Sequence, residues 1–148
     1  MTVKVGINGF GRIGRNILRG IIESDRQDID VVAINDLGPV KTNAHLLQFD
    51  SIHGRFPVDV KVNDIGIDAG RGFMRVSAER DPALLKWSDV DVALECTGFF
   101  TDRVRALAHL KNGSKRVLVS APSSGADKTI VYGVNHNTLT GDELIVSN

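Results

Sequence analysis

The chain has 148 residues, 42% of them hydrophobic and 24% charged, and its formal net charge at pH 7 is zero. These values are typical of a soluble globular domain that buries a real core, and they give no general attraction to nucleic acid or to an acidic membrane surface. No apolar run approaches the roughly 20 residues that cross a bilayer, and no signal peptide precedes Val3. A single cysteine excludes an internal disulfide and favours a reducing, cytoplasmic setting.

The first feature along the chain is a junction between a strand and a helix. Alternating apolar residues predict a buried parallel strand over 3–7, and apolar residues at helical spacing predict a helix over 12–24. Between them, Gly9 permits a tight turn, Gly11 lacks the Cβ that would hold a pyrophosphate away from the backbone, and Gly14 lets the helix lie close to the strand. The free N–H groups at the helix start favour an anion. This arrangement predicts a dinucleotide site, and the alternative is a merely flexible turn.

The second predicted strand, over 29–34, ends at Asn35 and Asp36. Asp36 lies about 22 residues after Gly14, where a nucleotide-binding βαβ unit carries an acidic residue. A carboxylate there can accept hydrogen bonds from both adenosine ribose hydroxyls. It also repels a 2′-phosphate, by about 4 kcal/mol at 4 Å and an effective dielectric of 20, and therefore favours NAD over NADP. The alternative is a solvated aspartate at a strand end.

The remaining elements alternate between strands and helices. A short helix over 42–49 and a loop over 50–57 precede period-two alternation over 58–76, which indicates a small antiparallel meander inserted between the two halves of a parallel sheet. A short helix ends near Trp87, and strands are expected at 90–96, 117–119, 130–131 and 144–146.

Asp102 is placed to cap a further helix, with Val104, Leu107 and Ala108 on its apolar face and Gly113 after its end. The whole pattern predicts an α/β fold with a Rossmann-type, doubly wound parallel sheet and a small antiparallel insertion. Its ligand crevice should lie at the carboxyl ends of the strands, where Gly9, Asp36, Thr97 and Ser120 converge.

The motifs along the whole chain resemble those of one enzyme family, phosphorylating glyceraldehyde-3-phosphate dehydrogenase. They are, in order, GINGFGRIGR (6–15), ND (35–36), DSIHGRF (50–56), ERDP (79–82) with Trp87, ECTGFF (95–100), SAP (120–122), GVNH (133–136) and IVSN (145–148). The resemblance implies that NAD is the cofactor and that residues 1–148 form the NAD-binding domain. The cofactor-binding residues that it implies are Asn8, Gly9, Gly11, Arg12, Ile13, Asn35, Asp36, Arg80, Thr97, Gly98, Phe100 and Ser120.

The resemblance also implies what this stretch lacks. In the family the catalytic cysteine and the general-base histidine follow the motif that ends at Asn148, so we expect no catalytic domain and no catalytic residue in the 148 residues. Cys96, at the end of an apolar strand, is expected to pack as a small hydrophobe. The four histidines, His45, His53, His109 and His136, show no metal-ligand spacing, so we expect no metal and ordinary loop or surface roles.

The function that follows is the cofactor half of a glycolytic oxidoreductase. The complete enzyme would be a cytoplasmic homotetramer that oxidises glyceraldehyde 3-phosphate with inorganic phosphate to 1,3-bisphosphoglycerate and reduces NAD, without a nucleic-acid or membrane partner. The 148 residues alone should bind NAD weakly and turn over nothing. Two alternatives are the cofactor domain of erythrose-4-phosphate dehydrogenase, against which Asp36 argues because glutamate is expected there, and a free-standing NAD-sensing module.

Overall fold

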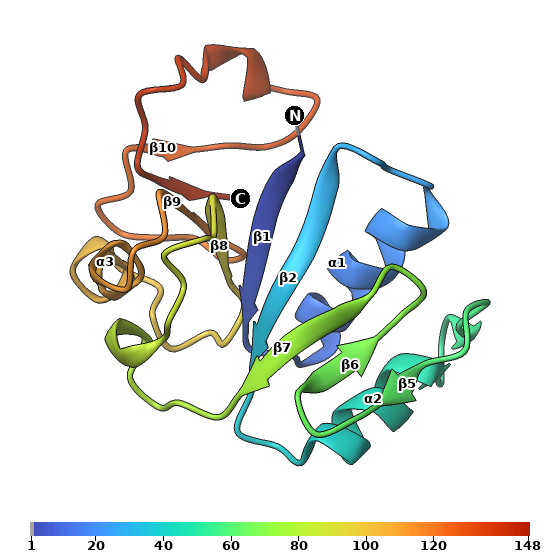
Figure 1. Ribbon diagram of the computed structural model, residues 1–148. Coiled ribbons are helices and arrows are strands. Elements are labelled where there is room, and N and C mark those ends of the chain that lie inside the picture. Colours follow the sequence, from blue (N-terminus) through green and yellow to red (C-terminus); the bar gives the residue numbers. More distant parts are fainter. Residues whose placement is uncertain (1) are drawn as a thin grey trace.

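The computed structural model describes residues 2–148, in which nine strands form one mixed sheet (Figure 1). The strands of this sheet are β1 (Val3–Asn8), β2 (Ile29–Asn35), β5 (Lys61–Val62), β6 (Gly66–Asp68), β7 (Phe73–Ser77), β8 (Val92–Glu95), β9 (Arg116–Val119), β10 (Lys128–Thr129) and β11 (Ile145–Ser147). Their spatial order is β10-β11-β9-β8-β1-β2-β7-β6-β5. The helices are α1 (Arg12–Glu23), α2 (Val40–Gln48) and α3 (Arg103–Lys111), with 3₁₀ turns η1 (Pro82–Leu84) and η2 (His136–Thr138).

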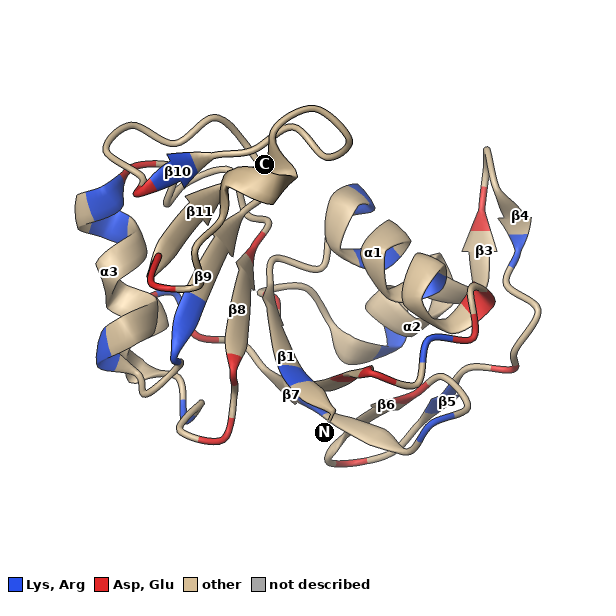
Figure 2. Cartoon of the chain, turned by 90° about the horizontal axis from the view of Figure 1, so that it is seen from above, with Lys and Arg blue, Asp and Glu red and all other residues tan. Residues whose placement is uncertain are grey.

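The central strands are parallel and are covered on both faces. β1 pairs in parallel with β2 on one side and β8 on the other, and Val5, Ile7 and Ile34 are buried beneath α1 and α2. Figure 2 shows α1 and α2 on one side of the sheet and α3 on the other. The predicted doubly wound sheet is therefore confirmed, since the chain passes to the other face after β7.

The antiparallel insertion lies at one edge of the sheet. β5, β6 and β7 form the predicted meander, but β7 also pairs in parallel with β2, so that Ala33 lies opposite Arg75. The insertion is thus adjacent to the parallel strands in space and does not separate their two halves. Period-two alternation reports that one strand face is buried, but it does not identify the neighbouring strand. In the predicted loop, β3 (Phe49–Asp50) and β4 (Gly54–Arg55) form a separate two-stranded sheet.

Helix α3 begins where the sequence predicts, but only part of the predicted face is buried: Leu107 packs against the core, as expected. The Asp102 carboxylate accepts a hydrogen bond from Arg105 N at 3.0 Å, as an N-cap residue does. The expectation that Val104 lies on the apolar face is wrong, because its side chain is 79% exposed. Ala106 and His109, three residues apart, are the buried pair and face the sheet. Among the described residues, no helix is both long enough and apolar enough to span a bilayer.

Helix α1 lies against β1 at a distance that only a glycine allows. A Cβ on Gly14 would stand 2.3 Å from Gly9 O and 3.0 Å from Ile7 Cγ2. This confirms the close approach of helix and strand that the third glycine of the motif predicts. In the same helix, a Cβ on Gly20 would meet no atom within 4 Å.

We expect Gly14→Ala to destabilise the protein by about 2 kcal/mol or more, because the added methyl group must push α1 away from the strand. The matched variant Gly20→Ala should instead be neutral or stabilising by up to about 1 kcal/mol, since alanine favours the helix and has room. Urea unfolding of both variants measures the difference. Equal free energies of unfolding for the two would contradict this account of the helix packing.

Candidate functional site

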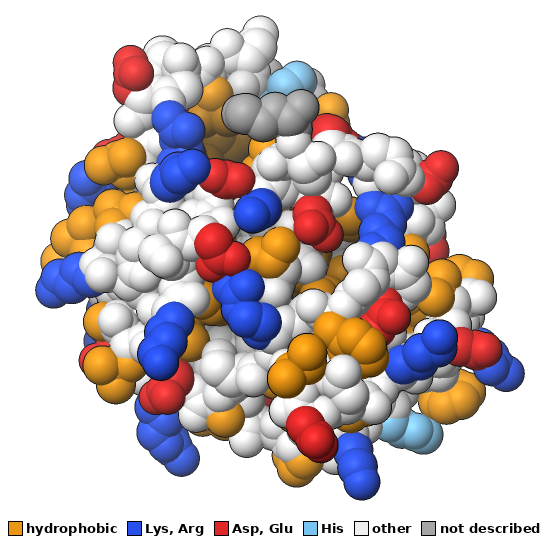
Figure 3. Space-filling view, in the orientation of Figure 1, with side chains coloured by type: hydrophobic (Ala, Val, Ile, Leu, Met, Phe, Trp, Pro, Cys, Tyr) orange, Lys and Arg blue, Asp and Glu red, His pale blue; other side chains and the backbone are white. Residues whose placement is uncertain are grey.

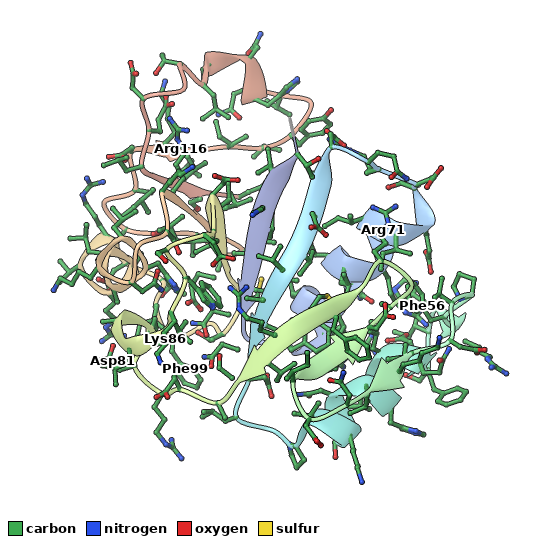
Figure 4. The ribbon with its side chains drawn as sticks, viewed as in Figure 1. Phe56, Arg71, Asp81, Lys86, Phe99 and Arg116 are labelled. Carbon is green, nitrogen blue, oxygen red and sulfur yellow. The ribbon has the colours of Figure 1, made fainter. Side chains whose placement is uncertain are left out.

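A cleft of about 470 Å³ opens at the carboxyl ends of β1, β2 and β8. This volume is within the range of sites that hold small molecules and cofactors. The lining residues are the last residues of β1 and β2 and residues of the loops that follow β1, β2, β7 and β8: Asn8, Gly9, Gly11, Asn35, Asp36, Leu37, Glu79, Arg80, Cys96, Thr97, Phe99 and Phe100. In Figure 4, Phe99 lies below the lower ends of the central strands, close to this edge of the sheet.

The structure brings most of the predicted cofactor residues to this cleft. Eight of the twelve line it: Asn8, Gly9, Gly11, Asn35, Asp36, Arg80, Thr97 and Phe100. Arg12, Ile13, Gly98 and Ser120 are not among the lining residues, although Arg12 and Gly98 directly adjoin residues that are. Ser120 lies farther away, and its hydroxyl donates to Glu95 O at 3.1 Å.

Sequence reasoning did not select four of the lining residues. Leu37, Glu79 and Phe99 each adjoin a predicted residue, and Cys96 immediately precedes Thr97. The available signal was position, because every residue that directly follows a parallel strand can reach the crevice at that edge.

The glycine turn forms one wall of the cleft. Gly9 has a φ of +90°, and a Cβ there would stand 2.7 Å from Thr97 N. Gly11 differs, because its φ is −73° and a Cβ would meet nothing within 4 Å. No side chain among residues 2–148 caps the start of α1 at Gly11. The N-terminal end of α1 therefore meets the cleft with its dipole uncapped, an arrangement that suits an anion.

Asp36, at the end of β2, also lines the cleft, and three N–H donors hold its carboxylate. Its Oδ2 accepts from Phe10 N at 2.8 Å, and its Oδ1 accepts from Gly38 N at 2.8 Å and from Asn43 Nδ2 at 3.1 Å. These bonds connect the end of β2 to the glycine turn and to α2. A carboxylate has about four lone-pair positions, so one position, on Oδ2, is left for a ligand.

Charged side chains near the start of α1 are partly paired. Arg12 Nη2 lies 3.9 Å from Asp50 Oδ2, and backbone N–H groups of His53 and Ile52, together with the Arg12 charge, hold the pKa of Asp50 below its usual value. Arg15 donates to Phe10 O at 2.8 Å and so supports the turn. Elsewhere, acidic and basic side chains are interspersed on the face shown in Figure 3.

Cys96 is half-buried at the cleft and packs against the main hydrophobic core. Burial raises the pKa of its thiol, and the nearby Glu95 carboxylate adds to this increase, against the smaller opposing effect of a hydrogen bond with Ser120. A thiol in this environment is a poor nucleophile at neutral pH. The packing role expected for Cys96 fits these contacts.

The prediction of a loop or surface role for His109 is wrong, while His45, His53 and His136 are exposed. The His109 side chain is fully buried, and its Nε2 lies 2.7 Å from Glu95 Oε2. Helical spacing alone could not reveal this partner, which lies on β8. Within residues 2–148, no group of three or more His, Cys, Asp or Glu side chains is arranged to hold a metal ion.

A doubly wound α/β sheet whose crevice combines a glycine turn, a helix start and an acidic residue on the second strand defines a nucleotide-binding domain. Residues 3–103 match the family model described as glyceraldehyde 3-phosphate dehydrogenase, NAD binding domain. The chain belongs to this family, and NAD is the cofactor that the family description names. The resemblance read from the sequence motifs is thereby confirmed.

Similar proteins from several bacteria carry the same name. The chain is 68% identical to the glyceraldehyde-3-phosphate dehydrogenase of Cereibacter sphaeroides over 148 residues, which is all of this chain and 44% of that protein. It is 67% identical to the enzyme of Xanthobacter flavus over 150 aligned residues, which cover this whole chain and 45% of that protein. It is 50% identical to that of Pseudomonas aeruginosa, again over the whole chain and 45% of the relative. The chain thus spans less than half the length of these relatives.

We expect alkylation of Cys96 by iodoacetamide to be slower than that of a free cysteine peptide at every pH up to about 9. Because the raised pKa leaves less thiolate at a given pH, the labelling rate should still be rising where the peptide has reached its plateau. Mass spectrometry of the single cysteine measures the rate over this pH range. Fast labelling at pH 7 would show that the thiol is activated, contrary to this environment.

Proposed function

We propose that the cleft holds NAD, and that residues 1–148 form the cofactor domain of a phosphorylating glyceraldehyde-3-phosphate dehydrogenase. One observation carries this proposal. The protein's own packing explains the glycines at positions 9 and 14, whereas at Gly11 the φ suits any residue and the space beside it is open. A glycine that the fold does not need, at the uncapped start of a helix and on the wall of a cleft, is explained by a ligand backbone that must come close.

The adenosine half of NAD would occupy the cleft. Backbone amides at Gly11, Arg12 and Ile13 would bind the pyrophosphate, and Asn8 would shape the turn. The Gly9 amide, expected in the same role, instead donates to Asn35 O at 2.8 Å. Support comes from the uncapped helix start beside Gly11 and from the side chain of Arg12, which is 46% exposed.

The other predicted residues would surround the adenosine and lead toward the nicotinamide. Arg80 would lie beside the adenine, and Thr97, Gly98 and Phe100 would border the adenosine and pyrophosphate. Ser120 would lie toward the nicotinamide ribose, outside the described cleft. When bound, NAD supplies the hydride acceptor of the reaction, and these side chains bind and orient it.

The remaining lone-pair position on Asp36 would bind the adenosine ribose, with Asn35 fixed behind it. Three of about four positions already accept hydrogen bonds from the protein. One ribose hydroxyl can therefore donate to the unoccupied lone-pair position. The second hydroxyl would have to share a carboxylate oxygen with an N–H group of the protein. Because the carboxylate is held in place before the ligand arrives, binding does not have to restrict its movement.

The reaction of the complete enzyme is a proposal that rests on the family resemblance of the sequence motifs and on the similar proteins' names. It would oxidise glyceraldehyde 3-phosphate with inorganic phosphate to 1,3-bisphosphoglycerate, in the cytoplasm and as a homotetramer. Residues 1–148 would contribute cofactor binding and no nucleophile, since their single thiol, that of Cys96, has a raised pKa.

We expect Gly11→Ala to weaken NAD binding at least tenfold and to change the free energy of unfolding by less than about 1 kcal/mol, because the methyl group meets ligand but no protein atom. Isothermal titration calorimetry and urea unfolding measure the two effects. Gly20→Ala is the matched control and should bind NAD like the unaltered protein. Unchanged affinity in Gly11→Ala would remove the main support for the proposed site.

We expect Asp36→Asn to weaken NAD binding and to reduce the preference for NAD over NADP at least tenfold. The full charge repulsion of about 4 kcal/mol at an effective dielectric of 20 sets the upper limit of this change. The dissociation constants of both nucleotides, measured at one salt concentration, give the ratio. The matched control is Asp64→Asn in the exposed turn between β5 and β6, and an Asp36→Asn protein with the original ratio would contradict the assignment.

We expect the 148-residue polypeptide to produce no NADH from NAD, glyceraldehyde 3-phosphate and phosphate, although it binds NAD. The physical reason is that its only thiol is kept in the unreactive protonated form. NADH absorbance, with a complete dehydrogenase as positive control, measures the activity. Phosphate-dependent NADH formation by the purified polypeptide would overturn this expectation.

A further inference from the structure

Glu95 on β8 and His109 on α3 form a pair that is closed to solvent. Both side chains are 0% exposed, and His109 Nε2 lies 2.7 Å from Glu95 Oε2. Removing a carboxylate from water is costly unless hydrogen bonds replace the lost solvent. The proposed NAD contacts use neither side chain, so a different role must explain why a carboxylate is kept here.

Four donors converge on the Glu95 carboxylate. Its Oε2 accepts from Asn8 Nδ2 at 2.7 Å and from His109 Nε2 at 2.7 Å, and its Oε1 accepts from Thr97 N at 2.8 Å and from the Thr97 hydroxyl. An ionised carboxylate only accepts, and it has about four positions for donors. The four donors therefore match an ionised Glu95.

The backbone N–H of Glu79 determines which atom is the donor in each hydrogen bond between Asn35, Asn8 and Glu95. Asn35 Oδ1 accepts from Glu79 N at 2.8 Å, which can only donate, and from the Ser77 hydroxyl at 2.9 Å. The Asn35 amide nitrogen must then donate, to Glu79 O at 2.8 Å and to Asn8 Oδ1 at 2.7 Å. Asn8 is thereby left with its own amide nitrogen as the donor to Glu95.

On the α3 side, a backbone N–H likewise determines the orientation of Asn112 and the position of the proton on His109. Asn112 Oδ1 accepts from Ser114 N at 3.1 Å, so the Asn112 amide nitrogen donates to Pro82 O at 2.9 Å and faces His109 Nδ1 at 3.5 Å. His109 therefore carries its proton on Nε2 and directs it at Glu95. Trp87 stacks on the imidazole, with ring centroids 5.8 Å apart, and holds its plane.

We propose that Glu95 and His109 are positioning residues for the nucleotide cleft, and this inference rests on the proposed function. Glu95 is connected to four cleft residues from four different segments: directly to Asn8 and Thr97, and through Asn8 to Asn35 and Glu79. Because the backbone N–H of Glu79 fixes the direction of these bonds, the group at the Glu95 position must only accept, which the ionised carboxylate does. Glu95 therefore connects the cleft wall after β7 to the wall after β8.

The substitution Glu95→Gln tests the charge with little change in shape. If the new amide nitrogen takes the place of Oε2, it faces Asn8 Nδ2, and Asn8 cannot reverse without opposing the Asn35 amide nitrogen. If it takes the place of Oε1, it faces Thr97 N, which can only donate. Either orientation breaks a bond to a cleft residue.

Two measurements on the 148-residue protein are needed. We expect Glu95→Gln to weaken NAD binding at least tenfold by calorimetry. We also expect amide hydrogen exchange at Glu79 to become faster relative to the amides of β1, which report global unfolding. The second measurement requires no ligand, so it decides the inference even if the unaltered protein fails to bind NAD, which would contradict the proposed function alone.

Glu143→Gln is the matched control. Glu143 is also a buried acid, 8% exposed, and it accepts hydrogen bonds from Thr140 N and Gly141 N on the loop before β11. Its substitution should reduce stability without changing the relative exchange at Glu79 or the NAD affinity of the folded protein. Equal effects of the two substitutions would assign Glu95 a general structural role and overturn the inference.

The pair His109→Leu and His109→Gln provides a second test, which also applies if Glu95→Gln fails to fold. Leucine removes the donor to Oε2, whereas glutamine can still offer an N–H. We expect His109→Leu to raise the dissociation constant for NAD severalfold and to speed exchange at Glu79, and His109→Gln to restore part of both. Faster exchange without weaker NAD binding, or no difference between the two variants, would overturn the positioning role.

Discussion

The close contact between the glycine turn and its neighbours is the constraint on which the rest of the structure depends. A hypothetical Cβ on Gly14 would stand 2.3 Å from Gly9 O, and one on Gly9 would stand 2.7 Å from Thr97 N. These contacts join β1, α1 and the end of β8 in one rigid corner. The cleft opens beside this corner, so its floor is set by backbone packing and is independent of side-chain rotamers.

Polar groups inside the domain then determine the shape of the cleft. Asp36 reaches from β2 to Phe10 N on the glycine turn, and Glu95 reaches from β8 to Asn8 on β1. Each carboxylate accepts several N–H groups, so each also connects the loops that continue beyond the ends of the paired strands. A site arranged in this way before its ligand binds avoids part of the entropy cost of association.

The sequence predicts the central sheet, α1 and the N-cap of α3 because each depends on local patterns of apolar residues, glycines and a capping acid. Of the eight cleft residues that it predicts, Gly9, Gly11, Asp36 and Thr97 follow from the glycine spacing and from the ends of parallel strands, and Asn8, Asn35, Arg80 and Phe100 follow from the resemblance to the family. It does not predict the parallel partner of β7, because alternation is the same beside any neighbour. The burial of His109 was missed because its partner, Glu95, lies on another element. Ser120 is absent from the cleft lining, since this cleft follows β1, β2, β7 and β8 and not β9.

The central claim is that the start of α1, beside Gly11, receives the diphosphate of NAD. The most direct test is a titration of the ¹⁵N-labelled protein with NAD, followed by NMR. The account predicts saturable shifts that are largest for the backbone amides of Gly11, Arg12 and Ile13, together with shifts at Leu37 beside the ribose site. Saturable shifts confined to other parts of the domain, or none at all, would contradict it.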